Sequence, residues 1–173
     1  MKQEVDVQFL TELCGWLEGT ALATWIAESW WAFPTIESLH VVAITLVVGS
    51  IAVADLRLLG LAWRSRPVTD VLRDVLPMTW VAYAVALLCG ALLFITQATK
   101  YIDNSAFQIK MLLMLLAGAN MLAFELITFR SVSKWDRGVP VPLAGQLAGA
   151  VSLACWLGIL VFGRQIGWTM YPG

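Results

Sequence analysis

The chain has 173 residues, of which 60% are hydrophobic and 13% are charged, and its formal net charge at pH 7 is -1. Soluble domains are roughly half apolar and a quarter charged, so this composition indicates a polytopic membrane protein without a separate soluble domain. The Lys and Arg residues form no block, which argues against a nucleic-acid partner. Cys14, Cys89 and Cys155 are scattered without a CxxC pair, which argues against a dithiol or thiolate metal site.

The first part of the chain, residues 7–31, mixes apolar side chains with acidic ones. Phe9, Leu13 and Trp25 alternate with residues such as Glu12 and Glu18. A wet face beside an apolar face is typical of helices that lie in the membrane interface. We expect one or two amphipathic interfacial helices here.

Four apolar stretches follow this segment. A transmembrane helix needs roughly 20 mostly apolar residues, and each stretch is long enough to cross once. We therefore predict an all-α fold, an integral membrane four-helix bundle that forms a single transmembrane domain over residues 1–173. The predicted spans cover about residues 33–63, 78–99, 106–130 and 142–163.

The basic residues predict how the bundle is oriented. They gather in the connections after the first and third spans and are sparse in the others; the two clusters are Arg64, Arg66 and Arg73, and Arg130, Lys134 and Arg137. Basic loops stay in the cytoplasm, so we expect a multi-pass protein of the bacterial cytoplasmic membrane with both termini outside and the N-terminus periplasmic. Tryptophans should form two interfacial belts, an outer one of Trp16, Trp25, Trp30, Trp31 and Trp168 and an inner one of Trp63, Trp80 and Trp135.

Two of the spans carry charges near their ends. The uncharged part of span one lies between Glu37 and Asp55, and that of span three between Lys110 and Glu125, both shorter than a hydrocarbon core. A charge at the edge of the core is costly unless it faces a partner or a cavity. At 100° per residue, His40 falls on the same face of span one as its two acids. We expect two polar layers between the spans, separated by an apolar middle.

Each polar layer has a predicted membership. The outer layer should gather Glu37, His40, Gln97, Tyr101, Lys110 and Arg164, and the inner layer Asp55, Arg57, Glu125 and Arg130. In the inner layer, the acids are expected to pair with the arginines and fix the helix register, the alternative being an inner gate. His40 and Lys110 are 70 positions apart, as are Asp55 and Glu125, which predicts two parallel helical hairpins.

The only histidine of the sequence, His40, is the most informative candidate. A histidine inside a bundle serves as a metal or haem ligand, a proton carrier or a hydrogen-bonded structural residue. Haem b needs an axial ligand, an apolar slot and cations for its propionates, here Lys110, Lys100 and Arg164. Two histidine ligands from one chain are excluded, which leaves a five-coordinate haem, a sixth ligand from Lys110 or a methionine, or a histidine of another protomer. Glu37, one turn away, would orient the imidazole.

The stretch "FPTIESLHVVAITLVVGSIAVADLRLLGL" resembles the opening of an uncharacterised bacterial four-span membrane family. More distantly, the pattern is similar to HemJ-type protoporphyrinogen oxidases and CopD-like membrane proteins. The HemJ resemblance implies a haem-ligating role for His40 and a functional role for Lys110 in "FQIKMLLMLLAGAN". Asn120 stands where that pattern has a further histidine.

Three functions are compatible with these features. The first is a haem-binding redox protein that passes electrons to a quinone or another membrane partner. The second is a carrier of a small solute or metal ion, copper first, because methionines of span three (Met111, Met114 and Met121) are soft ligands near His40. The third is a non-catalytic subunit that assembles as a homo-oligomer or within a larger membrane complex.

Overall fold

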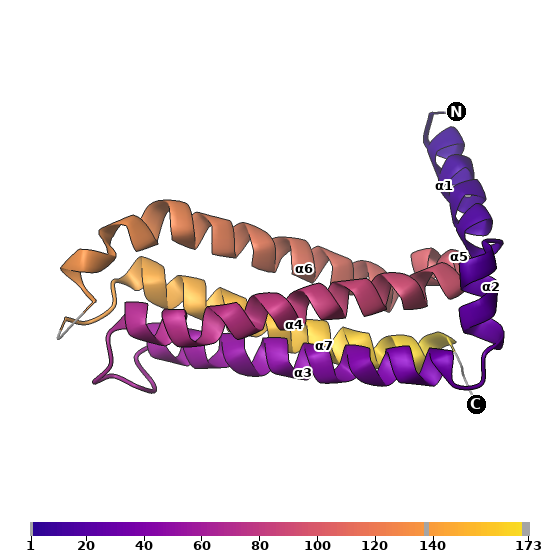
Figure 1. The fold of residues 1–173 in the computed structure, drawn as a ribbon. Coiled ribbons are helices and arrows are strands. Elements are labelled where there is room, and N and C mark those ends of the chain that lie inside the picture. The colour runs from indigo at the N-terminus through magenta and orange to yellow at the C-terminus, as the bar shows by residue number, and fades with distance from the viewer. Residues whose placement is uncertain (1, 137–138, 171–173) are drawn as a thin grey trace.

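The computed structural model describes residues 2–136 and 139–170, with side chains from residue 8 onward, so Arg137 lies outside the described residues. The described chain is helical throughout and contains no strand (Figure 1). Its elements are α1 (Lys2–Glu18), α2 (Ala21–Glu28), α3 (Ala32–Leu58), α4 (Val68–Thr96), α5 (Ala98–Asp103), α6 (Ser105–Ala123), the π-helix η1 (Phe124–Thr128), the 3-10 helix η2 (Phe129–Lys134) and α7 (Leu143–Met170).

Four helices of the described chain are long and apolar enough to cross a membrane: α3, α4, α6 with η1 and η2, and α7. The prediction of a multi-pass, all-helical membrane protein is confirmed. Helix α4 begins at Val68, ten residues before the start of the apolar stretch at Met78. Its first turns carry charges, including Asp70 and Asp74, so the helix continues beyond its apolar part. Helix α3 ends at Leu58, where Gly60 takes a positive φ of 68°.

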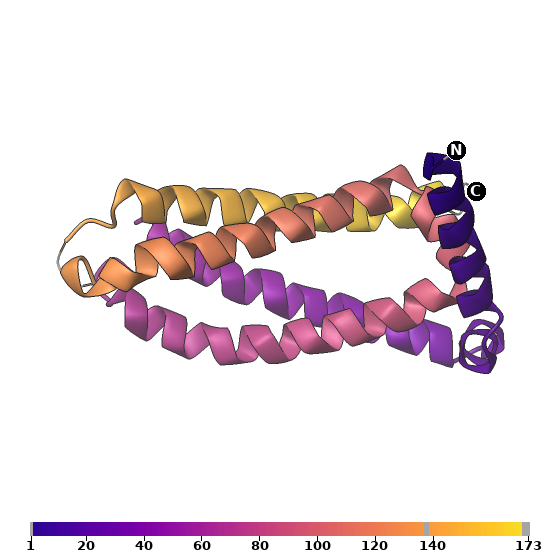
Figure 2. The ribbon, with the colours of Figure 1, turned by 90° about the horizontal axis from the view of Figure 1, so that it is seen from above.

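The four long helices form two hairpins, α3 with α4 and α6 with α7, and the two helices within each hairpin run antiparallel. Helix α3 also packs along α7, whereas α4 and α6 barely contact each other (Figure 2). A Cβ atom on Gly149 of α7 would lie 3.1 Å from the Asp55 carbonyl oxygen and 3.1 Å from the Leu58 Cβ atom. The missing side chain therefore lets α3 and α7 approach closely, as small residues do between membrane helices.

One end of the bundle, which we call the outer end, carries α1, α2 and α5 together with the end of α7 (Figure 1). Glu18 at the end of α1 accepts hydrogen bonds from the Thr99 amide (2.8 Å) and hydroxyl (2.7 Å), which ties α1 to the start of α5. Helices α1 and α2 run across the bundle rather than along it (Figure 1). The tryptophans of these two helices, Trp16 and Trp25, are exposed, while the placement of α1 and α2 in the membrane interface stays a prediction.

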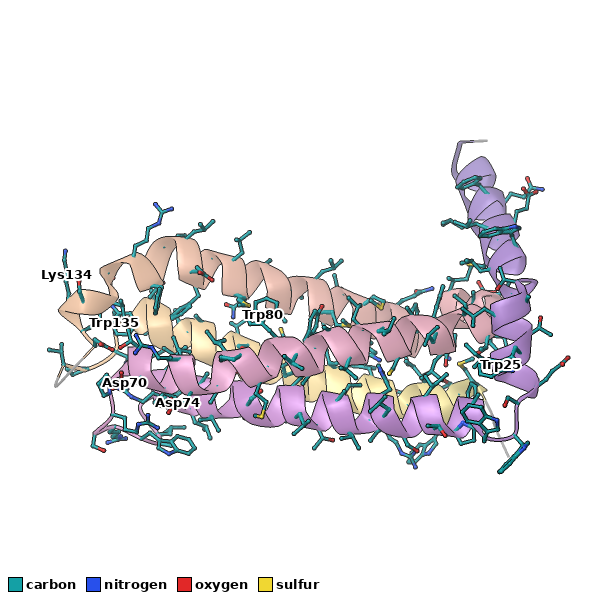
Figure 3. All side chains as sticks on the ribbon, in the orientation of Figure 1. Trp25, Asp70, Asp74, Trp80, Lys134 and Trp135 are labelled. Carbon is teal, nitrogen blue, oxygen red and sulfur yellow. The ribbon has the colours of Figure 1, made fainter. Side chains whose placement is uncertain are left out.

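The opposite, inner end carries the two basic connections. Asp136 from the second of them accepts hydrogen bonds from the Thr69 amide (3.0 Å) and hydroxyl (2.7 Å) and so caps the start of α4. Trp135 also lies at this end, far from Trp25 (Figure 3). It is only 5% exposed and packs with Leu58, Val68 and Val141. The expectation that Trp135 joins an interfacial belt is wrong, because its ring fills the core that closes the inner end.

Candidate functional site

Two cavities lie between the hairpins. The outer cavity has a volume of about 220 Å³ and the inner cavity about 260 Å³. Both are lined by side chains of α3, α4, α6 and α7, and they share Tyr83, Met114 and Trp156 as neighbours. The backbones of α4 and α6 are not closely packed, so the cavities are bounded on that side by side chains.

His40 of α3 lines the outer cavity and is held by the backbone of α4. Its Nδ1 atom lies 2.8 Å from the Ala86 carbonyl oxygen. A carbonyl only accepts, so Nδ1 carries the hydrogen and donates it, and in the neutral ring Nε2 keeps its lone pair. A Cβ atom on Gly90 would lie 3.0 Å from the imidazole Cε1 atom, so this glycine makes room for the ring. The ring is oriented with one nitrogen still able to bind a ligand.

Lys110 of α6 lines the same cavity from the other hairpin. Its side chain runs past Gly163 of α7, with Nζ 3.9 Å from the position of a Cβ atom there, and is half-buried. The ammonium group is close enough to interact electrostatically with the His40 imidazole. The structure thus brings together the two residues singled out by the sequence, while their roles as ligands stay predictions.

Aromatic rings cover the outer side of the outer cavity. Phe94 of α4 and Phe107 of α6 line it and stack with centroids 5.6 Å apart and planes 16° apart. Tyr101 of α5 packs against both rings, at 5.8 Å and 5.4 Å. Gln97 lies at the break between α4 and α5, where its φ is -151°. Tyr101 and Gln97 are therefore outside the cavity lining, with Tyr101 supporting the rings that form it.

Two predicted members of the outer layer lie elsewhere. Glu37 is exposed, and the nitrogen that it was expected to orient is bound to the Ala86 carbonyl, so the orienting role assigned to Glu37 is wrong. Arg164 is exposed and its guanidinium lies over the Trp168 ring, 5.5 Å from the centroid. Near the outer end, a long charged side chain reaches water more easily than a protein cavity, which explains its position. Lys110 is the one cationic residue among the described residues that line this cavity.

The inner layer differs from the predicted set of ion pairs. Asp55 is 4% exposed, and its carboxyl group lies near Ser152 of α7, not against an arginine. Arg57 follows by two residues, about 200° around the helix, and donates instead to the Arg66 carbonyl oxygen at 2.8 Å. Glu125 and Arg130 are both exposed. The expected register-fixing pairs are wrong, although Asp55 and Glu125 do line one cavity.

Sequence reasoning missed several residues that shape the two cavities. The Ala86 carbonyl is a backbone group, which has no signature in the sequence. Gly90 is one of several glycines in the apolar spans, and nothing in the sequence relates it to His40. Ser152 and Asn120 are polar residues of otherwise apolar spans, and this contrast could have indicated that they face the interior of the bundle. Among the described residues, no three His, Cys, Asp or Glu side chains are grouped so that they could hold a metal ion.

The comparisons with known proteins give one match. A family model described as "Family of unknown function (DUF6644)" matches residues 15–169, which include all four long helices up to the last turn of α7. No curated protein and no solved structure matches the chain.

Proposed function

The chain belongs to the DUF6644 family, and we propose that it is a haem-binding redox protein of the membrane, with His40 as the axial ligand in the outer cavity. The observation that carries the proposal is the hydrogen bond from His40 Nδ1 to the Ala86 carbonyl. In haem and metal sites, the ligating histidine donates its other ring hydrogen to a carbonyl or carboxylate in this way. The bond fixes the tautomer that offers Nε2 to an iron atom.

The walls of the outer cavity suit an apolar macrocycle. They include Val47, Leu87, Phe94, Phe107 and Ile159. The volume of about 220 Å³ is below the roughly 300–1,000 Å³ of sites for drug-sized ligands. A haem would therefore extend between α4 and α6, whose backbones are not closely packed, and the stacked Phe94 and Phe107 rings on that side would have to separate. This side also gives a lipid-soluble partner such as a quinone direct access.

Lys110 supplies the second function of the site. It faces His40 from the other hairpin, where it would either bind a propionate or take the sixth coordination position. A bound haem supplies reversible one-electron transfer, and the surrounding side chains set its potential through burial and charge. The ammonium group of Lys110 is the charge in the cavity lining that would influence this potential. Arg164 is assigned no role, because it lies over Trp168.

The orientation of the bundle in the membrane is part of this proposal. We place the outer end in the periplasm and the two basic connections in the cytoplasm of a bacterial cell, with α1 and α2 in the outer interface. The distant relation to HemJ-type and CopD-like proteins is supported by His40 and Lys110, which line one cavity. Porphyrin oxidation itself is not proposed, because Asn120 replaces the further histidine and donates to the Ala148 carbonyl at 2.9 Å.

An absorption spectrum tests the proposal. The full chain, purified in mild detergent and incubated with haem, is expected to give a Soret band that shifts on reduction and that His40→Ala removes. Arg164→Ala is the control and should leave the band unchanged. A wild-type protein that takes up no haem, or a Soret band that is the same in His40→Ala, would contradict the proposal.

A copper carrier is the second candidate, and one observation favours it. Met111 and Met114 line the outer cavity together with His40, and thioether and imidazole groups are a suitable ligand set for Cu(I). On this alternative, the purified protein would bind Cu(I) stoichiometrically, and the double variant Met111→Leu/Met114→Leu would lose that binding. Haem uptake that survives the double variant, without copper binding in the wild type, favours the first candidate.

A further inference from the structure

The inner cavity has an unusual combination of walls. Five aromatic residues line it, and most of the other lining residues are aliphatic; the aromatic ones are Trp80, Tyr83, Phe124, Phe129 and Trp156. Among the described residues of the lining there are two carboxylates, Asp55 and Glu125, and no lysine, arginine or histidine. The cavity is therefore apolar, aromatic and negatively charged when its acids are ionised.

Asp55 is the buried group that this cavity leaves without a counter-ion. The residue is 4% exposed, and its Oδ2 atom has no hydrogen-bond partner among the described residues. The Ser152 hydroxyl of α7 lies near the carboxyl group. The nearest arginine along the chain, Arg57, is bound to the Arg66 carbonyl. A buried carboxylate without a positive partner is costly, and a bound cation would remove that cost.

The other polar groups of the cavity also favour a cation. Asn120 donates one of its two side-chain amide hydrogens to the Ala148 carbonyl, and its side-chain oxygen is an acceptor. The single hydroxyl hydrogen of Thr79 has two acceptors within reach, the Ser50 hydroxyl oxygen at 2.7 Å and the Val75 carbonyl at 2.9 Å. Glu125 lies in the π-helix η1, and single π-turns inside α-helices occur frequently at functional sites. The lining thus presents two acceptors that a cation could contact, the Asp55 Oδ2 atom and the Asn120 side-chain oxygen.

We propose that the inner cavity binds a lipophilic organic cation, an ammonium group on an apolar body, with Asp55 as its counter-ion. The aromatic walls add cation–π attraction and contact for the apolar body. A hydrated inorganic cation fits less well, because Mg²⁺ and Ca²⁺ need about six or more oxygen ligands and this lining is mostly carbon. Such a ligand enters from the bilayer, on the side where α4 and α6 barely touch. The site adjoins the outer cavity, with which it shares Tyr83, Met114 and Trp156, but His40 and Lys110 do not line it.

Equilibrium dialysis of radiolabelled 4-phenylbutylamine against the full chain in lipid nanodiscs tests this site, with 4-phenylbutan-1-ol as the uncharged probe and empty nanodiscs as background. The wild type should bind the ammonium about tenfold or more tightly than the alcohol, as expected for a charge-assisted hydrogen bond. Asp55→Asn should remove that preference without changing alcohol binding. Asp74→Asn, an exposed carboxylate at the start of α4, is the matched control and should behave as the wild type.

Two results would overturn the proposal. One is equal binding of the two probes by the wild type, which needs no variant and so does not depend on the folding of Asp55→Asn. The other is displacement of the ammonium probe by millimolar Na⁺ or Mg²⁺, which would indicate an inorganic cation site. His40→Ala should leave ammonium binding unchanged, so failure of this site and failure of the haem site are observed separately.

Discussion

Two features of α4 position the His40 ring: a backbone carbonyl that accepts its hydrogen and a glycine that leaves room for it. The Ala86 carbonyl takes the Nδ1 hydrogen, and Gly90, one turn further along the helix, gives the ring its space. Within α4, the Ala86 carbonyl already accepts the backbone hydrogen bond from the Gly90 amide. A carbonyl oxygen has two lone pairs, so one remains. The imidazole uses the second of them, so its orientation requires no other polar side chain.

Gly90→Ala is expected to displace the imidazole and weaken haem binding. The new methyl group would lie 3.0 Å from Cε1 of His40, and overpacking of this kind costs about 1–3 kcal/mol, equivalent to roughly 5- to 150-fold in affinity. Haem titration followed at the Soret band measures the change. Gly49→Ala in α3 is the matched control, because a Cβ atom there meets nothing within 4 Å. Equal haem affinity in Gly90→Ala and the wild type would show that the His40 ring does not lie beside Gly90 when haem is bound.

At this scale, the sequence was informative for the two polar residues His40 and Lys110, which interrupt apolar spans. His40 and Lys110 could be paired because each lies near the start of its span, and the structure places both on one cavity. The positions of Glu37 and Arg164 could not be predicted, because a side chain near a helix end can turn either to water or to the interior. Helical periodicity gives the face of a residue but not that choice.

At the scale of elements, the two hairpins are joined mainly through α3 and α7. Gly149 permits this contact, and its neighbours across the interface are Asp55 and Leu58. The inner cavity lies beside the same contact, since Ala148 and Ser152 on α7 belong to its lining. The separation of α3 and α7 therefore controls both the stability of the bundle and the width of the cavity.

Gly149→Ala is expected to lower the free energy of unfolding by about 1–3 kcal/mol, because the added methyl group would meet backbone and Cβ atoms at 3.1 Å. Unfolding of the purified protein in mixed micelles, followed by helical circular dichroism, measures the change. Gly167→Ala, on the same helix with nothing within 4 Å of its Cβ position, should be neutral or slightly stabilising. A Gly149→Ala protein as stable as Gly167→Ala would mean that α3 and α7 are not in close contact.

The helix boundaries show where sequence patterns stop being informative. Hydropathy located the four spans, because lipid-facing residues must be apolar, but it placed the start of the second span at Met78 although α4 begins at Val68. The added turns are amphipathic and pack at the inner end, where Val68 and Val71 are fully buried. The π-helix Phe124–Thr128 had no signal, because a change of hydrogen-bond register leaves composition and hydropathy unchanged.

At the scale of the whole molecule, the two ends of the bundle differ in chemistry. The basic connections lie at one end, and the tryptophan-bearing α1 and α2 lie at the other (Figures 1 and 3). The native cysteines suit a labelling experiment, because Cys14, Cys89 and Cys155 are all buried. Burial, with a smaller contribution from Glu18 and Asp103, also raises the pKa of the Cys14 thiol. That thiol stays protonated at neutral pH and reacts slowly.

Two exposed serines then report the orientation. Ser65→Cys at the inner end and Ser105→Cys at the outer end place a reactive thiol on each side. A membrane-impermeant maleimide added to intact bacterial cells is expected to label Ser105→Cys at once and Ser65→Cys only after the cells are opened. The wild type gives the background. Immediate labelling of Ser65→Cys alone would reverse the proposed topology.

The central claim is that the His40 imidazole points Nε2 at a ligand within the outer cavity. The most direct test replaces the imidazole side chain with free imidazole in solution. His40→Gly removes the ring but leaves the Ala86 carbonyl and the space at Gly90 that held it. We predict that His40→Gly loses the Soret band given by haem-loaded wild type, and that free imidazole restores the band with its reduced-minus-oxidised difference spectrum. A haem spectrum unchanged in His40→Gly without added imidazole would contradict the account.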